Sequence, residues 1–410
     1  MTAVRQPSEP TESEPPQSDT VLRTADDVEA YVASICFKTG PPELVGAELE
    51  WTVHHTADPT RPLDPTVLST ALGPYAPPTL HPDSPHRTLP RGSTVTVEPG
   101  GQVEISTPPY SSLSELHAAT RSDLAQLTDR LASAGLALGA TGIDPHRPPR
   151  RLLHTPRYDA MACAFERRGP EGLTMMCSTA GLQVCLDVGE PDRLAARWEA
   201  LHALGPALLA GFANSAWHAG RHTGWASARM ASWFGIDPAR TGAVHTGGDV
   251  AEAWARYALR APLVCLDNGP AWHAPAGVSF ADWLAGAIRR PPTAADLQLH
   301  LSTLFPPVRP RGYFEVRYLD AQPPGEWLAP VAVLTALLAD DDTVDQTRDL
   351  CGPAAGRWLA AARTGLADPV LNTAAHRVLD LACRRLDRTD LTATDRQHVT
   401  EIVSRRLAST

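Results

Sequence analysis

Hydrophobic and polar residues alternate in four stretches of this chain. Alternation with a period of two predicts half-buried β-strands. The stretches are 45–53, 93–110, 173–188 and 313–319. The second stretch is the clearest hairpin, because Pro99-Gly100-Gly101 forms a turn sequence between its two alternating halves. In the third stretch, we expect the strand to break near Gly181.

Four further segments have hydrophobic residues at helical spacing. These segments are 25–36, 112–135, 191–214 and 326–410. Asp26 and Asp27 lie near the start of the first segment and Gly135 lies just past the second, as is typical of helix ends. Residues 56–92 are rich in proline and lack a period, so we interpret them as a long connection.

These elements together predict an α+β protein, in which antiparallel strand pairs are separated by helices. Residues 1–20 are rich in Pro, Ser and Glu, a composition typical of a disordered tail. We expect residues 21–410 to form a single domain, with a helical C-terminal portion over residues 325–410. The sequence has no internal repeat.

The charge balance excludes some classes of function. The chain has 36 Lys and Arg residues against 46 Asp and Glu residues, a formal net charge of −10. Nonspecific binding to nucleic acid or to an anionic membrane needs a basic footprint, which this composition does not supply. No apolar run approaches the ~20 residues of a membrane span, and residues 1–20 have no apolar core of a secretory signal. We therefore expect a cytoplasmic protein without nucleic-acid or membrane partners.

Lysine is nearly absent, which narrows the possible phosphate-binding chemistry. Lys38 is the only lysine, and it lacks the upstream glycine spacing of a phosphate-binding loop. If the chain handles ATP, arginines and metal ions must neutralise the phosphates. The seven cysteines are scattered without a CxxC pair, so we interpret them as reduced, structural thiols and predict no redox switch.

Five glutamates lie in or beside the predicted strands, although glutamate is depleted in strands. Glu48 and Glu50 are two positions apart, so both point to one face, ~6.6–6.8 Å apart along the strand. Glu98 and Glu104 flank the hairpin turn, and pairing across the turn can bring them to the same face. Glu315 lies in a third strand, with an arginine two positions later.

Two interpretations fit these glutamates. They can line the solvated face of a half-exposed antiparallel sheet. Alternatively they are buried together, which is costly unless cations neutralise them, and hard oxygen ligands suit Mg²⁺ or Mn²⁺. Such ions can bridge phosphate oxygens. The repetition in three strands, with Arg317 in register in one of them, favours a metal–nucleotide site.

Other kinds of site have little support in the sequence. His218 and His222 have i, i+4 spacing, but Gly220 lies between them and weakens a helix, and no HExxH is present. No GxSxG motif surrounds a serine, which argues against a serine hydrolase. We interpret the ten tryptophans as core and pocket packing rather than as a platform for stacking bases.

Seven segments of the chain occur in an order that is characteristic of one enzyme family. They are GAELE, VEPGGQVEIS, PRYDAM, MMCSTAGLQVCLD, GFANS, SARMASW and LFPPVRPRGYFEVRYLD. The chain resembles the plant-like class of glutamate–cysteine ligases, which includes the actinobacterial enzymes of ergothioneine biosynthesis. The resemblance covers about residues 45–320, most of the predicted domain.

The resemblance implies a fold similar to the catalytic domain of glutamine synthetase, with a curved antiparallel sheet forming a cup and helices outside it. It implies that ATP phosphorylates the γ-carboxylate of glutamate and that the amine of cysteine then displaces phosphate, giving γ-glutamylcysteine for ergothioneine synthesis. Residues 21–410 are then the catalytic ligase domain. The implied cofactors are two or three Mg²⁺ or Mn²⁺ ions, with ATP as co-substrate; the oligomeric state is left open.

The resemblance also assigns roles to individual residues. The positions that match the family's metal ligands are Glu48, Glu50, Glu98, Glu104 and Glu315. The positions that match catalytic groups are Arg317, for the transferring phosphoryl group, and Gln183, near the metals or the reacting carboxylate. The matching substrate positions are Arg157, Tyr158 and Arg229, and the matching nucleotide positions are Arg309 and Arg311. For each substrate arginine, ordinary surface ion pairing is the alternative.

Three rival functions share some of these features. A related ligase that activates glutamate but uses another amine acceptor would have the same glutamates. A non-catalytic protein that binds ATP or an amino acid would keep the sheet, but complete retention of the five glutamates argues against it. A phosphotransferase acting on a guanidino group would share the glutamates and arginines but not the other motifs.

Overall fold

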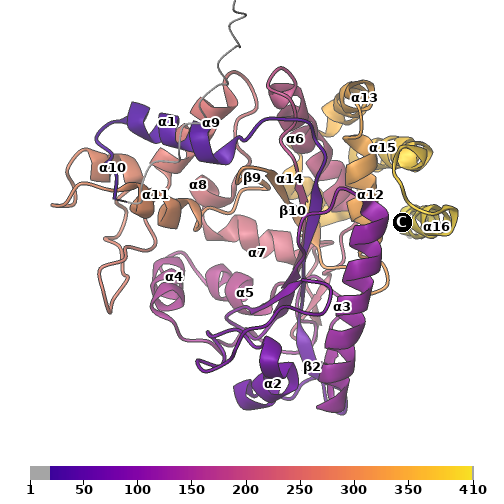
Figure 1. Ribbon diagram of the computed structural model, residues 1–410, viewed down its shortest axis with the longest axis horizontal. Coiled ribbons are helices and arrows are strands. Elements are labelled where there is room, and N and C mark those ends of the chain that lie inside the picture. Colours follow the sequence, from indigo (N-terminus) through magenta and orange to yellow (C-terminus); the bar gives the residue numbers. More distant parts are fainter. Residues whose placement is uncertain (1–18, 409–410) are drawn as a thin grey trace, which may run out of the picture.

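A six-stranded sheet runs through the centre of the molecule in the computed structural model, which describes residues 19–408 (Figure 1). The strand order is β3-β4-β1-β6-β10-β9, and every pair in it is antiparallel. The strands are β1 Val45–Trp51, β3 Thr94–Val97, β4 Val103–Ser106, β6 Gly181–Leu186, β9 Val308–Pro310 and β10 Phe314–Asp320. The three predicted glutamate-bearing segments therefore lie in one sheet.

The alternation in β1 shows how the sequence divides the two faces of this sheet. Ala47, Leu49 and Trp51 are buried on one face and exclude water there. Glu48 and Glu50 point to the opposite face and are only half-buried. One face is therefore a hydrophobic core surface, and the other is a charged surface.

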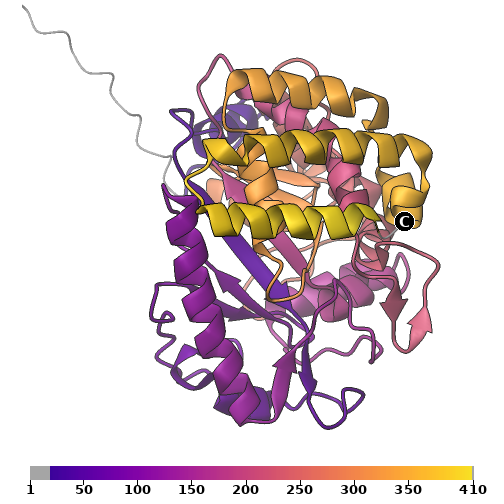
Figure 2. The ribbon, with the colours of Figure 1, turned by 90° about the vertical axis from the view of Figure 1, so that its right-hand side faces the viewer.

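Helices cover both faces of the sheet. On the charged face lie α4 Pro156–Glu166, α5 Glu171–Ser178 and α7 Ala228–Ile236 (Figure 1). On the hydrophobic face lie α6 Leu194–Gly211 and the C-terminal helices, three of which cross the front of Figure 2 side by side. The C-terminal helices are α12 Leu328–Leu337, α13 Asp341–Cys351, α14 Trp358–Thr364, α15 Pro369–Arg385 and α16 Ala393–Ala408. The predicted α+β class and the helical C-terminal portion are confirmed.

The remaining elements surround this central unit. The other α-helices are α1 Ala25–Cys36, α2 Pro65–Leu72, α3 Leu113–Ser133, α8 Pro238–Thr241, α9 Val250–Arg260, α10 Phe280–Leu284 and α11 Ala294–Leu301. Two small sheets pair β2 Val53–His55 with β5 Leu136–Leu138, and β7 Trp217–His218 with β8 Arg221–His222. Single 3₁₀ turns are η1 Gly73–Tyr75, η2 Gly352–Ala354, η3 Gly365–Ala367 and η4 Leu386–Arg388.

Two sequence interpretations need correction. The segment 173–188 is not one strand: its first half belongs to α5, and the strand β6 begins at Gly181. The connection 56–92 contains α2, because the Asp64 side chain caps its first turn and Pro65 occupies a position where proline suits a helix. The argument against a helix over His218 and His222 is confirmed, because both residues lie on a two-stranded hairpin.

Two further expectations concern the N-terminal tail and membrane-spanning helices. The predicted tail, residues 1–20, lies outside the described residues except for its last two. Over residues 19–408, none of the helices has the length and apolar character needed to cross a membrane.

Candidate active site

A cavity of about 310 Å³ lies between the charged face of the sheet and helices α4, α5 and α7. It contains most of the side chains that the sequence singled out. The predicted site residues that line it are Glu48, Glu50, Glu98, Glu104, Arg157, Tyr158, Gln183, Arg229, Arg309, Arg311 and Arg317. Glu315 is not among the lining residues, and its side chain is completely buried. We refer to this space as the carboxylate cavity.

Strand register brings the glutamates together. Glu50 on β1 lies directly opposite Glu104 on β4. Glu48 on β1 lies opposite Gln183 on β6. Glu98 follows β3 in the hairpin turn, and the tight turn fixes its position. Residues that face each other across neighbouring strands have Cβ atoms about 4.5–5.5 Å apart, so the sheet itself concentrates negative charge here.

The electrostatics of the four cavity glutamates reflect this crowding. Burial, followed by repulsion from Glu104 and Glu315, raises the pKa of Glu48 to about 7. Burial and the neighbouring Glu98 raise the pKa of Glu104 to about 7. Burial raises the pKa of Glu50 well above its ordinary value. The charged forms are therefore disfavoured unless a positive ligand enters the cavity.

Hydrogen bonds compensate only part of this charge. The Gly181 amide donates to Glu50 over 2.8 Å, and the Thr96 hydroxyl donates to Glu104 over 2.8 Å. Within residues 19–408, the carboxylates of Glu48 and Glu98 accept no hydrogen bond, and none of the four forms an ion pair within 4.0 Å. The four glutamates are thus not paired directly with the arginines that line the same cavity.

Glu315 differs from the other four glutamates. Its carboxylate forms ion pairs with Arg309 over 2.6 Å, with Arg317 over 2.6 Å and with Arg311 over 3.2 Å. Although burial opposes ionisation, Arg309 and Arg317 hold the pKa of Glu315 well below its ordinary range. In this structure Glu315 therefore organises three arginines, and the sequence expectation that it is a metal ligand stays a prediction.

Arg317 occupies an irregular point of the sheet. The register between β10 and β6 shifts between Val316 and Leu319, which is the signature of a β-bulge. Arg317 donates to the Gln183 side chain as well as to Glu315, while its Nε has no hydrogen-bond partner in the described structure. A bulge re-aims side chains, and here it directs a largely buried cation at the cavity.

Arg229 supplies a second buried cation, from the first turn of α7. Its Nη2 donates to the Arg317 carbonyl oxygen over 2.9 Å, and its guanidinium lies over the Trp233 ring, 5.1 Å from the ring centroid. Asp320 is its counter-charge, with 4.0 Å between the nearest atoms. The Arg229 Nε has no hydrogen-bond partner among the described residues. A buried donor of this kind fits an anionic ligand group.

Arg157 and Tyr158 enter the cavity from the first turn of α4. The Thr155 hydroxyl caps this helix by accepting from the Tyr158 amide. Arg157 donates to the hydroxyl of Ser302 over 2.8 Å and to its carbonyl oxygen over 3.1 Å. Both residues therefore face the cavity rather than forming the surface ion pairs that were the alternative.

The residues present fit a divalent cation by the chemistry of their donor atoms. Carboxylate oxygens are the preferred ligands of Mg²⁺ and Mn²⁺, and the raised pKa values show that these groups need positive charge. In the described part of the chain, however, no three acidic, histidine or cysteine side chains are close enough together to form a metal site. The number of metal ions and the identity of their ligands therefore stay predictions.

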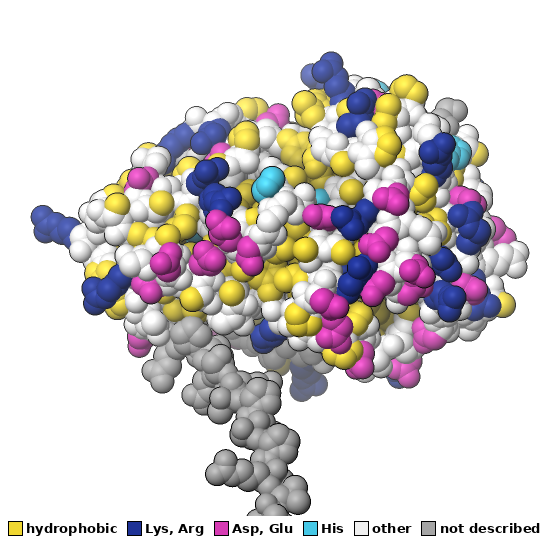
Figure 3. Space-filling model, turned by 90° about the horizontal axis from the view of Figure 1, so that it is seen from above, with side chains coloured by type: hydrophobic (Ala, Val, Ile, Leu, Met, Phe, Trp, Pro, Cys, Tyr) yellow, Lys and Arg dark blue, Asp and Glu magenta, His cyan; other side chains and the backbone are white. Residues whose placement is uncertain are grey.

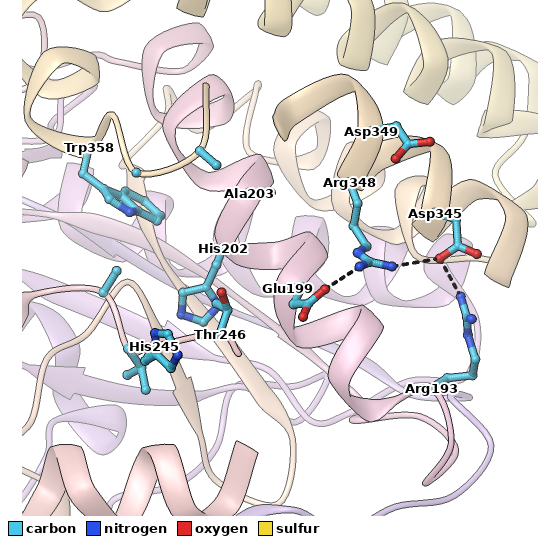
Figure 4. A pocket seen from close by; sticks show the side chains of 14 residues that line it. Arg193, Glu199, His202, Ala203, His245, Thr246, Asp345, Arg348, Asp349 and Trp358 are labelled. Atoms are coloured by element: carbon cyan, nitrogen blue, oxygen red, sulfur yellow. Dashed lines mark hydrogen bonds and ion pairs between the residues drawn. The ribbon is translucent and has the colours of Figure 1, made fainter. Parts of the chain in front are cut away.

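A second hollow, of about 730 Å³, lies on the other side of the sheet between α6, α13 and residues 243–246 (Figure 4). It shares no lining residue with the carboxylate cavity. Its charged groups pair with one another, since Arg348 contacts Glu199 over 2.5 Å and Asp345 over 3.4 Å. The face seen from above likewise carries interspersed acidic and basic side chains (Figure 3). Unpaired glutamates thus distinguish the carboxylate cavity from this second hollow.

Comparison with known proteins assigns the chain to a family. The family model described as glutamate-cysteine ligase family 2 matches residues 44–408, nearly the whole chain. The chain belongs to glutamate–cysteine ligase family 2. This assignment confirms the resemblance that the sequence motifs indicated, and it identifies the chain as a ligase.

Individual members of glutamate–cysteine ligase family 2 are clearly similar. The chain is 41% identical over 369 residues to "Glutamate--cysteine ligase EgtA" of Mycolicibacterium smegmatis, covering 88% of this chain and 85% of the relative. It is 31% identical over 317 residues to the chloroplastic glutamate–cysteine ligase of Arabidopsis thaliana, covering 72% and 60%. A solved glutamate–cysteine ligase of Francisella tularensis, in complex with AMP, aligns at a TM-score of 0.49 and 13% identity, covering 90% and 83%.

The sequence analysis did not predict several residues in or beside the carboxylate cavity. Ser302 orients Arg157, and Asp320 faces Arg229. The remaining wall includes three methionines, Met161, Met175 and Met176. Asp320 lies three positions after Arg317, so a regular strand would place the two on opposite faces. The bulge between Val316 and Leu319 brings Asp320 to the same side of the sheet as Arg317, which allows its 4.0 Å approach to Arg229. A bulge leaves no clear pattern in one sequence.

Proposed function

We propose that this chain is an ATP-dependent glutamate–cysteine ligase that forms γ-glutamylcysteine, ADP and phosphate. One observation carries the proposal: in a member of the glutamate–cysteine ligase family, four half-buried glutamates without ion pairs face five arginines across one cavity. Glutamate, cysteine and ATP all carry anionic groups, so the arginines and bound cations must neutralise them.

The proposed metal ligands are Glu48, Glu50, Glu98 and Glu104, with Glu315 as the fifth matching position. Two or three Mg²⁺ or Mn²⁺ ions held there would supply charge neutralisation for the phosphate oxygens of ATP. The raised pKa values of Glu48 and Glu104 support this assignment, because a neighbouring dication favours the ionised carboxylates. The assignment of each glutamate to one ion is not part of the proposal.

The first proposed step transfers the γ-phosphoryl group of ATP to the γ-carboxylate of glutamate, which gives an acyl phosphate and ADP. A carboxylate is a poor electrophile, and phosphorylation converts one of its oxygens into a good leaving group. Arg317, which donates to Glu315 and Gln183, is assigned to contact the transferring group. Arg309 and Arg311 lie on the same wall and are assigned to the nucleotide phosphates.

In the second proposed step, the amine of cysteine attacks the acyl carbon of the acyl phosphate. The bond from carbon to the phosphate oxygen breaks, phosphate leaves, and the amide bond of γ-glutamylcysteine forms. Arg157, Tyr158 and Arg229 are assigned to substrate binding, since an arginine fork suits an amino-acid carboxylate. Binding both reactants in one cavity would bring the amine close to the acyl carbon.

The sequence resemblance also suggests where the product goes. The actinobacterial members of the resembled class supply γ-glutamylcysteine to ergothioneine synthesis, and we extend that role to this chain as part of the proposal. A cytoplasmic location fits this role and stays a prediction.

Release of ADP tests the proposed function. The protein would be incubated with ATP, Mg²⁺ and glutamate, with cysteine or other amines as acceptor, and the products identified by mass spectrometry. We expect cysteine-dependent ADP release and a γ-glutamylcysteine product. Release with a different amine alone would keep glutamate activation but reject cysteine as the acceptor. No release from folded protein with any acceptor would reject the proposal.

A further inference from the structure

Helices α4, α5 and α7 line one side of the carboxylate cavity, and we call the apolar side chains on this side, with Phe305, the apolar corner. Met161, Met175 and Met176 line this corner, together with Trp233 and Phe305. All five side chains are less than 9% exposed. The whole chain has only five methionines, so three of them in one wall of one cavity is a strong concentration. We call Met161, Met175 and Met176 the methionine wall.

The methionine wall is held in place by its surroundings. Met161 comes from α4 and the other two come from the last turn of α5, and these helices pack on each other. The carbonyl oxygen of Met175 accepts from the Thr179 hydroxyl over 2.6 Å, and that of Met176 accepts from the Gln102 side chain over 3.3 Å. The wall is therefore a fixed part of the cavity.

Two aromatic rings complete the apolar corner. Phe305 meets Trp233 edge-on, with 5.4 Å between the ring centroids. Trp233 also contacts cationic groups, since the guanidinium groups of Arg229 and Arg317 both lie over its ring. Trp233 thus marks the boundary between the apolar corner and the anion-binding part of the cavity.

Each substrate of the proposed reaction can be compared with this corner. The glutamate side chain ends in a carboxylate, and the ATP triphosphate is a polyanion, so both require arginines or cations. The cysteine side chain is a short CH₂–SH group, weakly polar and polarizable. Thioethers and aromatic rings make favourable contacts with such sulfur groups. Of the two amino-acid side chains, that of cysteine is the one that suits this surface.

We propose that the methionine wall is the subsite for the side chain of the amine acceptor and selects a thiol over a hydroxyl. The inference rests on the proposed function, because it deepens the description of the same site. A serine hydroxyl in this corner would lose its water partners, whereas a thiol loses little on transfer from water. Two polar groups border the wall: Thr179, whose hydroxyl proton is already donated to the Met175 carbonyl oxygen, and the buried Trp233 indole N–H, which has no partner among the described residues. Selection against serine therefore depends on the apolar methionine side chains.

The wild-type protein gives the first test, with no variant required. Values of kcat/KM for ADP release are measured with L-cysteine, with L-2-aminobutyrate, in which a methyl replaces the thiol, and with L-serine. We expect the first two within about 10-fold of each other and serine about 100-fold below cysteine, as for an apolar pocket that meets a hydroxyl. Use of serine as efficiently as 2-aminobutyrate would overturn the subsite.

Variants locate the selectivity in the wall. We expect Met161→Gln, Met175→Gln and Met176→Gln to lower the ratio of cysteine to serine efficiency by about 5- to 10-fold, because the amide offers the hydroxyl a partner. The matching Met→Leu variants should keep the ratio, since leucine is apolar and similar in volume. Leu152→Gln is the control, because Leu152 lines a different hollow. An unchanged ratio in all three Gln variants would contradict the assignment.

The same assays separate this inference from the proposed function. Cysteine-dependent ADP release without discrimination against serine rejects the subsite and keeps the ligase. A rise in the KM for ATP in the Gln variants, with the acceptor ratio unchanged, would place the nucleotide in this corner and reject the subsite. Absence of ADP release with every acceptor would reject both.

Discussion

The carboxylate of Asp320 lies 4.0 Å from Nη1 of Arg229, and both side chains are buried. Asp320 also accepts hydrogen bonds from the Ser215 hydroxyl over 2.7 Å and the Ser227 hydroxyl over 2.8 Å. Ser227 in turn caps α7 by accepting from the Met230 amide over 3.2 Å. Asp320 therefore balances the charge of Arg229 and fixes the start of the helix that carries it.

The first prediction concerns this positioning role of Asp320. We expect Asp320→Asn to raise the KM for an amino-acid substrate by about 10-fold or more, because loss of the counter-charge lets Arg229 turn away. The KM for ATP should change less than about 2-fold. Steady-state kinetics with each substrate varied in turn measures both. A larger change in the KM for ATP would remove Asp320 from the amino-acid end of the cavity.

Asp123→Asn is the matched control for this prediction. Asp123 is also fully buried and accepts hydrogen bonds from the amides of Arg91 and Ser93, but it forms no ion pair with an arginine of the cavity. This variant should lose thermal stability without changing the ratio of the two KM values. If it shifts that ratio as much as Asp320→Asn does, the effect is general destabilisation rather than positioning.

The second prediction concerns Arg229 itself. We expect Arg229→Ala to raise the KM for an amino acid by about 100-fold, because the bidentate partner of a carboxylate is lost, and to leave the KM for ATP nearly unchanged. In the double variant with Asp320→Asn, the two effects should not add, since both act on one guanidinium. Full additivity, or a rise in the KM for ATP instead, would assign Arg229 another role.

The third prediction concerns the glutamates of β1. Glu48→Gln and Glu50→Gln keep the size of the side chain but remove its charge. We expect kcat to fall by about 10²- to 10⁴-fold in each, because charge neutralisation of the phosphates is lost. Activity assays over a range of Mg²⁺ concentrations measure this effect. Near-normal kcat in both variants would remove these residues from the metal-binding role.

The fourth prediction follows from the raised pKa values of Glu48 and Glu104. A carboxyl group whose pKa is raised on folding stabilises the folded state below its unfolded pKa, and this stability is lost as the pH rises through the folded value, here about 7. Without Mg²⁺, thermal stability should therefore fall between about pH 5 and pH 8. Glu48→Gln should reduce this fall, by on the order of 1–3 kcal/mol.

Thermal unfolding at several pH values, with and without Mg²⁺, tests this sign. Added Mg²⁺ should stabilise the protein more at the higher pH, where the carboxylates are ionised. The opposite trend would mean that these glutamates are already neutralised in the free protein. Glu315 should behave in the reverse sense, because arginines lower its pKa and acid removes that stability.

The fifth prediction concerns the turn that carries Glu98. A Cβ atom on Gly100 would lie 2.0 Å from the carbonyl oxygen of Cys177, which is a backbone atom and has little room to move. We expect Gly100→Ala to destabilise the protein by about 1–3 kcal/mol. Gly325→Ala offers a comparison, because space is open around that residue and its φ is not positive. Equal melting temperatures for Gly100→Ala and wild type would contradict the close approach of hairpin and α5.

Much of the fold could be predicted from local sequence signals. Thr24 caps α1 at the expected position, and Pro99-Gly100-Gly101 joins β3 and β4 as the hairpin pattern indicated. The errors have physical causes. Residues 173–178 alternate too weakly to distinguish a buried helix from a strand, since Met175 and Met176 are both buried in α5.

The candidate site was predictable only where spacing constrains it. The period of two placed Glu48 and Glu50 on one face, and resemblance to the family supplied Arg157 and Arg229. The ion pairs that occupy Glu315 depend on how β9 and β10 pair, which one sequence does not specify. The methionine wall and Asp320 were not predicted, because they come from packing of α5 on α7 and from a bulge.

The most direct test of the account follows one oxygen atom. Glutamate labelled with ¹⁸O in both γ-carboxyl oxygens would be converted with ATP and cysteine, and phosphate and product analysed by mass spectrometry. The account predicts one labelled oxygen in the released phosphate and one in the amide of γ-glutamylcysteine, because the carboxylate oxygen leaves with the phosphoryl group. Product formed with unlabelled phosphate would contradict activation of glutamate by phosphoryl transfer in the carboxylate cavity.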